Sequence, residues 1–144
     1  MKLNTMAAVM TFVSKIETDS SRFYQDQAEK YPELKDCFLS WVKENKKFEK
    51  QVKQTYYGVI TDTLESNFAF GDLDTDDYDL ALSLPENAAL SQAKDRALET
   101  EENIKKFYLR AAALSESLMA DIPRLFKKIA KKREERSTAL TSFK

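Results

Sequence analysis

The chain contains 144 residues, of which 42% are hydrophobic and 33% are charged, and its formal net charge is −1. This length and balance predict one folded domain over residues 1–144 and exclude a disordered chain. Histidine is absent and the only cysteine is Cys37, which excludes Ser-His-Asp and Cys-His catalysis, histidine-bearing zinc sites and an internal disulfide. Two glycines and three prolines supply too few turns for an all-β fold.

Four stretches repeat apolar residues at helical spacing, and they predict helices at about residues 6–30, 32–58, 88–118 and 122–141. Asn4 or Thr5 is the candidate N-cap of the first helix, and Asp121 is the candidate N-cap of the fourth. Tyr31 separates the first two helices, because a residue that precedes proline is driven out of the α region.

A long acidic segment, at about residues 61–87, lies between the second and third predicted helices. It includes a short alternation of apolar residues at Tyr78, Leu80, Leu82 and Leu84. A connection of this length is uncommon inside a compact domain, but one helical architecture requires it. The sequence therefore predicts an all-α fold, an antiparallel four-helix bundle with a long crossover between helices two and three.

Four aspartates of this crossover are spaced like the ligands of a calcium loop: Asp72, Asp74, Asp76 and Asp79. The EF-hand pattern also requires glycine at its sixth position and glutamate at its twelfth, where this sequence has Asp77 and Ser83. A specific calcium site is therefore not expected, and the sequence leaves the role of residues 72–79 open.

Charge is distributed unevenly, with a net charge of −10 over residues 61–103 and of +7 over residues 104–144. A basic C-terminal helix is compatible with binding to nucleic acid or to an anionic membrane. No nucleic-acid motif accompanies these cations, and cations near a helix C-terminus interact favourably with the helix dipole. No apolar run is long enough to span a membrane. We therefore expect a cytoplasmic protein with a solvated basic helix, without membrane or nucleic-acid binding.

The first and third predicted helices share a repeated pattern. Residues 16–24 read IETDSSRFY, and residues 100–108 read TEENIKKFY. In each stretch a glutamate lies seven residues before the tyrosine of a Phe-Tyr pair. The repeat predicts two equivalent halves of the bundle, each with one glutamate at a matching position. We expect the two tyrosines, Tyr24 and Tyr108, to be core aromatics.

On these residues the sequence resembles the rubrerythrin-like branch of the ferritin-like superfamily. The resemblance is carried, in chain order, by IETDSSRFYQDQAEKYPELKDCFLSWVKENKKFEK, DLDTDDYDLALSLPEN, LETEENIKKFYLRAA and IPRLFKKIAKKREER. It implies a ferritin-like antiparallel four-helix bundle with a di-iron site at its centre. The family's site takes one glutamate from each of two helices and a Glu-x-x-His motif from each of the other two.

The resemblance also implies that the di-iron site is degenerate. Two of the six ligand positions keep a glutamate and four do not: Glu17 and Glu101 are kept, Asn45 and Phe48 replace the first Glu-x-x-His motif, and Arg133 and Arg136 replace the second. Glu44 and Glu134 lie one residue from the replaced glutamates, so a shift of register would restore a carboxylate but no histidine. We therefore expect neither a metal nor another cofactor.

Two glutamates that face each other in a dry core are costly unless their charges are neutralised. The fourth helix offers two guanidinium groups three residues apart, Arg133 and Arg136. We predict that they pair with the two glutamates in a metal-free ionic core. In the same prediction Phe48 fills the space of the first histidine, and Asn45 forms a hydrogen bond with a carboxylate. In the alternative arrangement both arginines extend to solvent and the glutamates are partly hydrated.

Two functions follow from this sequence. The favoured one is a non-enzymatic ferritin-like bundle that has lost di-iron binding and has a structural or protein-interaction role, as a homodimer and with a protein partner that the sequence does not identify. The alternative is a rubrerythrin-like metal-binding oxidoreductase or iron-handling protein. That alternative requires an atypical carboxylate site for iron or manganese, built from Glu17, Glu101, Glu44 and Glu134.

Overall fold

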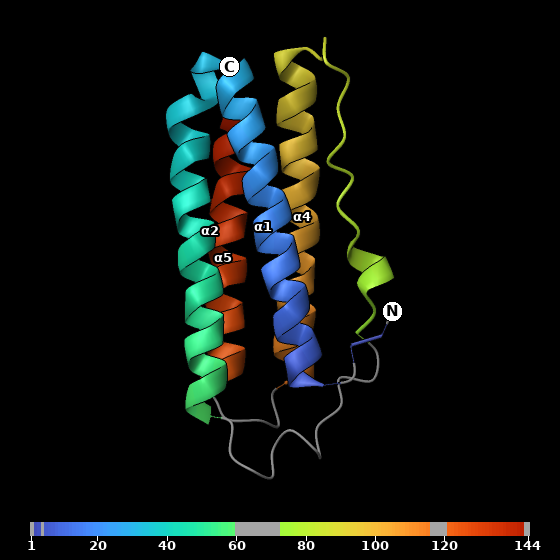
Figure 1. Ribbon diagram of the computed structural model, residues 1–144, viewed down its shortest axis with the longest axis vertical. Coiled ribbons are helices and arrows are strands. Elements are labelled where there is room, and N and C mark those ends of the chain that lie inside the picture. The colour runs from blue at the N-terminus through green and yellow to red at the C-terminus, as the bar shows by residue number, and fades with distance from the viewer. Residues whose placement is uncertain (1, 4, 60–72, 116–120, 143–144) are drawn as a thin grey trace.

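The computed structural model describes residues 2–3, 5–59, 73–115 and 121–142. Its helices run along one common axis (Figure 1) and are α1 (Met6–Lys30), α2 (Pro32–Val59), α4 (Leu90–Leu114) and α5 (Asp121–Ser142). A short 3-10 helix, η1 (Thr75–Tyr78), precedes α4. Over these described ranges no β-strand is present. The predicted all-α four-helix bundle is therefore confirmed.

The helices pack mainly as two antiparallel pairs, α1 with α2 and α4 with α5, and α2 also contacts α5. Residues 73–89 run beside α4 from one end of the bundle to the other (Figure 1). The predicted crossover, at about residues 61–87, therefore joins the two pairs, although its residues 61–72, which include Asp72, lie outside the described residues. None of the helices described here is long and apolar enough to cross a membrane.

Local signals explain where the helices begin and end. The Thr5 hydroxyl accepts a hydrogen bond from the Ala8 amide at 3.1 Å, which makes Thr5 the N-cap of α1. Tyr31 has an extended backbone (φ −126°, ψ 96°) and ends α1, and Pro32 opens α2. The prediction for Asp121 is wrong, because this residue is the first of α5 and does not precede the helix.

The third helix differs most from its predicted bounds of 88–118. It begins at Leu90, after Ala89, whose amide donates to Gln92 Oε1 at 2.7 Å. At the other end Ser115 already forms a turn, since its amide donates to both Ala111 O and Ala112 O. Residues 116–120 lie outside the described part of the chain. The start of the helix is therefore set by Gln92, its third residue, through this hydrogen bond. The apolar pattern does not set it.

The alternation in the crossover has a packing explanation. Residues 79–85 form no strand, but their backbone carries alternate side chains to the bundle. Tyr78 and Leu80 pack against the core cluster that contains Phe107, and Leu82 and Leu84 pack against the cluster around Phe38. Residues 73–89 thus form a strap along the bundle, in which the residues between these apolar side chains (Asp79, Ala81, Ser83 and Pro85) are exposed.

A hydrogen bond joins the α1–α2 turn to the end of this strap, because the half-buried Tyr31 hydroxyl donates to Ala88 O. We expect the Tyr31→Phe substitution to lower the free energy of unfolding by about 1 kcal/mol, the usual net value of such a bond. Urea denaturation measures this change. Tyr57→Phe is the matched control, because Tyr57 is 71% exposed, and equal losses in both variants would contradict the assignment.

A buried ionic centre as the candidate functional site

Two glutamates lie in the middle of the bundle, on different helices. Glu17 on α1 is 2% exposed and Glu101 on α4 is fully buried. Each lies on the apolar face of its helix, since Val13 is buried one turn before Glu17, and Ile104 is buried one turn beyond Glu101. Helical spacing therefore holds both carboxylates inside the core.

Arg133 of α5 bridges these two glutamates. Its Nη1 donates to Glu101 Oε1 at 2.8 Å and to Glu101 Oε2 at 3.0 Å. Its Nη2 donates to Glu17 Oε2 at 2.8 Å and lies against Glu17 Oε1 as well. The side chain is 0% exposed, so the contact excludes water and ties α1, α4 and α5 together through one guanidinium.

Arg136, one turn further along α5, extends the network to α2. Its Nη1 donates to Glu101 Oε1 at 3.0 Å, and its Nη2 and Nε donate to Glu44 Oε1 at 2.7 and 3.1 Å. Nη2 also donates to the backbone oxygen of Trp41 at 3.3 Å. The side chain of Glu44 is 33% exposed, so this end of the network reaches the surface. Together the two arginines connect all four helices.

Aromatic rings from α2 enclose the guanidinium groups. The Phe48 ring centroid lies 5.6 Å from Arg133 Cζ and 5.4 Å from Arg136 Cζ. The Trp41 centroid lies 5.2 Å from Arg136 Cζ. Such contacts stabilise a desolvated cation by attraction to the ring face. Phe48 is buried and occupies the space beside both arginines.

The two repeat tyrosines are not equivalent in the structure, although both are fully buried. The Tyr24 hydroxyl donates to Glu101 Oε1 at 2.5 Å. The Tyr108 hydroxyl has no hydrogen-bond partner among the described residues. Burial raises the pKa of both tyrosines above the ordinary value, and the nearby Glu101 carboxylate adds to the shift at Tyr24. Both hydroxyls therefore stay protonated, and only Tyr24 takes part in the ionic centre.

Burial and pairing act in opposite directions on the charged groups. Burial raises the pKa of the Glu101 carboxyl overall, although Arg136 and the Tyr24 hydroxyl act to lower it. Burial and the neighbouring positive charge of Arg136 lower the pKa of Arg133. The carboxylates that it contacts favour the charged guanidinium. Burial also acts to lower the pKa of Arg136, but the adjacent Glu101 and Glu44 raise it overall. The charged form of each group in the centre is therefore stabilised by its neighbours of opposite charge.

Three sequence expectations differ from the observed contacts. Asn45 is buried but donates to the hydroxyls of Ser20 and Ser21, at 3.1 and 3.0 Å, and does not donate to a carboxylate. Glu134 is exposed on α5, away from the centre. Glu44, considered only as a displaced metal ligand, is instead a partner of Arg136. The sequence signal for that pair is weak, because Glu44 and Arg136 are 92 residues apart in the chain.

The donor set does not fit a di-iron centre. Guanidinium groups already bind the carboxylates of Glu17 and Glu101, and the other four positions at which the resemblance implies ligands carry an amide, a phenyl ring and two permanent cations. Divalent iron requires carboxylate and imidazole donors, and positive charges at the site repel it. Where side chains are described, no group of three or more His, Cys, Asp or Glu residues is placed to hold a metal ion.

No family model, no curated protein sequence and no solved structure matches this chain.

Removal of the bridging guanidinium should destabilise the fold. We expect Arg133→Ala to cost about 3–5 kcal/mol of unfolding free energy, since two buried carboxylates lose their partner. Lys131→Ala, two residues away on the exposed face of α5, is the matched control and should have little effect. Chemical denaturation and melting temperatures measure both, and equal stabilities would contradict a buried bridge.

Tyr24 and Tyr108, which occupy matching positions in the two repeated stretches, provide a second comparison. We expect Tyr24→Phe to lower the unfolding free energy by about 1.5–3 kcal/mol, the range for a hydrogen bond to a charged group. Tyr108→Phe should be neutral or stabilising, because it removes a buried hydroxyl without a partner. Urea denaturation of the two variants gives the difference, and a larger loss for Tyr108→Phe would overturn the observed asymmetry.

Proposed function

We propose that this protein is a non-enzymatic, ferritin-like helical bundle that has lost di-iron binding and has a structural or protein-interaction role. The observation that supports the proposal is the guanidinium of Arg133, which lies between Glu17 and Glu101 within 3.0 Å of both. In the family that the sequence resembles, iron ions neutralise the carboxylates at these positions. Here a permanently charged side chain does so.

The chemistry of the centre supports a structural role over a catalytic one. Its carboxylates are occupied by hydrogen bonds, its tyrosines stay protonated, and its arginines are enclosed by rings. None of these groups is poised to accept a proton or to attack a substrate at neutral pH. What the network does supply is a single preferred arrangement of four helices, since another packing would strand buried charges.

A homodimer is the form in which we propose that the bundle acts. This part of the proposal rests on the resemblance alone, because the two large apolar side chains that are exposed among the described residues, Tyr57 on α2 and Leu109 on α4, lie on different helices and define no single contact surface. Sedimentation velocity over a range of concentrations tests this proposal, and a monomer at every concentration would contradict it. The cytoplasmic location stays a prediction, as does a further protein partner.

The alternative function is a rubrerythrin-like oxidoreductase or iron-handling protein that uses iron or manganese. It would require Glu17, Glu101 and Glu44 to leave their arginine partners. The exposed Glu134 would also have to turn inward. The partial exposure of Glu44 is the one observation that favours it, because it gives solvent ions a path to a carboxylate.

Metal analysis separates the two functions. We expect the protein, expressed with added iron or manganese and then desalted, to contain neither metal in stoichiometric amount, because the two guanidiniums repel cations. Its melting temperature should not change when a chelator is added. Inductively coupled plasma mass spectrometry measures the content. Stoichiometric iron together with peroxidase activity would reject the proposal and establish the alternative.

A further inference from the structure

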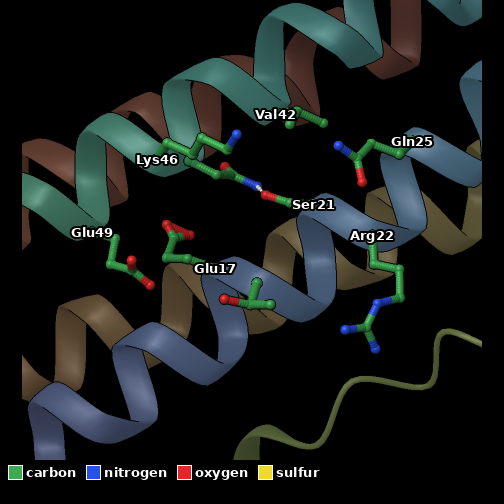
Figure 2. Close-up of a pocket in the computed structure, with 9 residues that line it drawn as sticks. Glu17, Ser21, Arg22, Gln25, Val42, Lys46 and Glu49 are labelled. Carbon is green, nitrogen blue, oxygen red and sulfur yellow. Dashed lines mark hydrogen bonds between the residues drawn. The ribbon is translucent and has the colours of Figure 1, made fainter.

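The charges on the outer surface of α2 differ between the two sides of the helix. Lys46 lies on the side that faces α1, where Figure 2 shows it among the residues that line a groove, together with Arg22, Glu17 and Glu49. Cations and anions therefore balance one another in that groove. The side of α2 that faces α5 has no such balance.

Three lysines of α2 lie on the side toward α5. Lys47 lies one turn beyond Glu44, which pairs with Arg136 of α5, so helical spacing places Lys47 near α5 as well. Lys43 and Lys50 lie one turn to either side of Lys47. All three lysines are exposed.

Two lysines of α5 lie next to these. Lys132 lies one turn before Arg136, the residue that reaches α2, and Lys128 lies one turn before Lys132. Lys128 is exposed, and the side chain of Lys132 is 44% exposed. We refer to the five residues together as the lysine face: Lys43, Lys47, Lys50, Lys128 and Lys132.

The lysine face is poorly neutralised by its own chain. Lys132 pairs with Glu135 at 3.6 Å, in an exposed contact of a kind that contributes little. The other four lysines form no ion pair with any residue that the structure describes. Lysines at this spacing along one helix repel one another, and so do lysines on adjacent helices. The fold therefore keeps these positive charges together at a cost to its stability.

The helix dipole does not explain why the cations lie there. Cations are favoured in the last turn of a helix, whereas neither α2 nor α5 has a basic residue in its last turn. Lys128 and Lys132 lie near the middle of α5 instead. The compensation that the sequence suggested for the basic C-terminal helix is therefore missing at the lysine face, and an anion from outside the chain would supply it.

We propose that the lysine face binds a short acidic segment of a partner protein. From Lys43 to Lys50 the face extends for about 10 Å, the rise of two helical turns. Because α2 and α5 run antiparallel, the exposed acids Asp36 and Glu135 both lie beyond the same end of the face. A nucleic acid or a membrane surface extends past that end and would meet these acids, whereas a segment with a few Asp or Glu residues fits within the face. This inference names the chemistry of the partner in the protein-interaction role proposed above, and it rests on that role.

Fluorescence anisotropy with a short, labelled peptide of glutamates tests the proposal on the intact chain. We expect saturable binding that weakens as the salt concentration rises, because exposed charges are screened. Lys47→Gln combined with Lys128→Gln removes one cation from each helix of the face, and it should weaken binding at least about tenfold, a difference of about 1.4 kcal/mol. Lys15→Gln combined with Lys30→Gln changes the net charge equally on α1, and this matched control should retain the affinity of the wild type. Both variants should fold, since the replaced residues are exposed and glutamine is as good a helix former as lysine.

Three outcomes would overturn the proposal. The first is an absence of saturable peptide binding, and the second is an equal loss of affinity in the two double variants. The third is single-stranded DNA of the same charge that binds as tightly as the peptide and loses as much affinity when the lysine face is altered, because the face would then select negative charge alone. Metal analysis tests the proposed function separately, so a protein that contains no iron and binds no peptide would refute only this inference.

Discussion

The bridge from Arg133 to Glu17 and Glu101 is the contact on which the rest of the bundle depends. A guanidinium that is 0% exposed is tolerated here because acceptors reach both Nη atoms of Arg133, although they do not reach its Nε. The two carboxylates are tolerated beside it only because the guanidinium is there. Each of these three charged groups would destabilise the fold if it were buried alone, but together they neutralise one another. The four helices must therefore pack in one register, at the level of these residues, before any of the buried charges is satisfied.

This dependence gives the centre a different role from that of the apolar clusters on either side of it. Leu, Ile and Phe side chains tolerate small shifts of one helix along another, since dispersion and burial have little direction. Hydrogen bonds at 2.7–3.1 Å, such as those of Arg136 to Glu44, do not tolerate such shifts. The apolar clusters supply most of the driving force for folding, and the ionic centre selects one helix alignment among those that burial alone would allow.

The helices could be predicted because one apolar stripe per helix and a few local signals, such as Thr5 and Pro32, determine them. The structure also places Arg133 in contact with Glu17 and Glu101, the two glutamates that the sequence repeat predicted inside the bundle. Arg136 contacts Glu101, one of the two glutamates expected for it. Its contact with Glu44 could not be predicted, because the stagger of α2 against α5 decides whether Glu44 lies within reach. The orientation of a single amide at Asn45 depends on neighbouring hydroxyls, and the apolar pattern carries no information about it.

The two helical hairpins contribute unlike charges to their shared interior. The hairpin of α1 and α2 brings only acids, Glu17 and Glu44, whereas the hairpin of α4 and α5 brings Glu101 together with Arg133 and Arg136. If two copies of the α1–α2 hairpin packed together, their interface would contain four acids and no cation. If two copies of the α4–α5 hairpin packed together, four guanidiniums would share only two acids. Association between molecules is thus disfavoured unless each α1–α2 hairpin packs against an α4–α5 hairpin. The strap of residues 73–89 keeps a matching α4–α5 hairpin on the same chain.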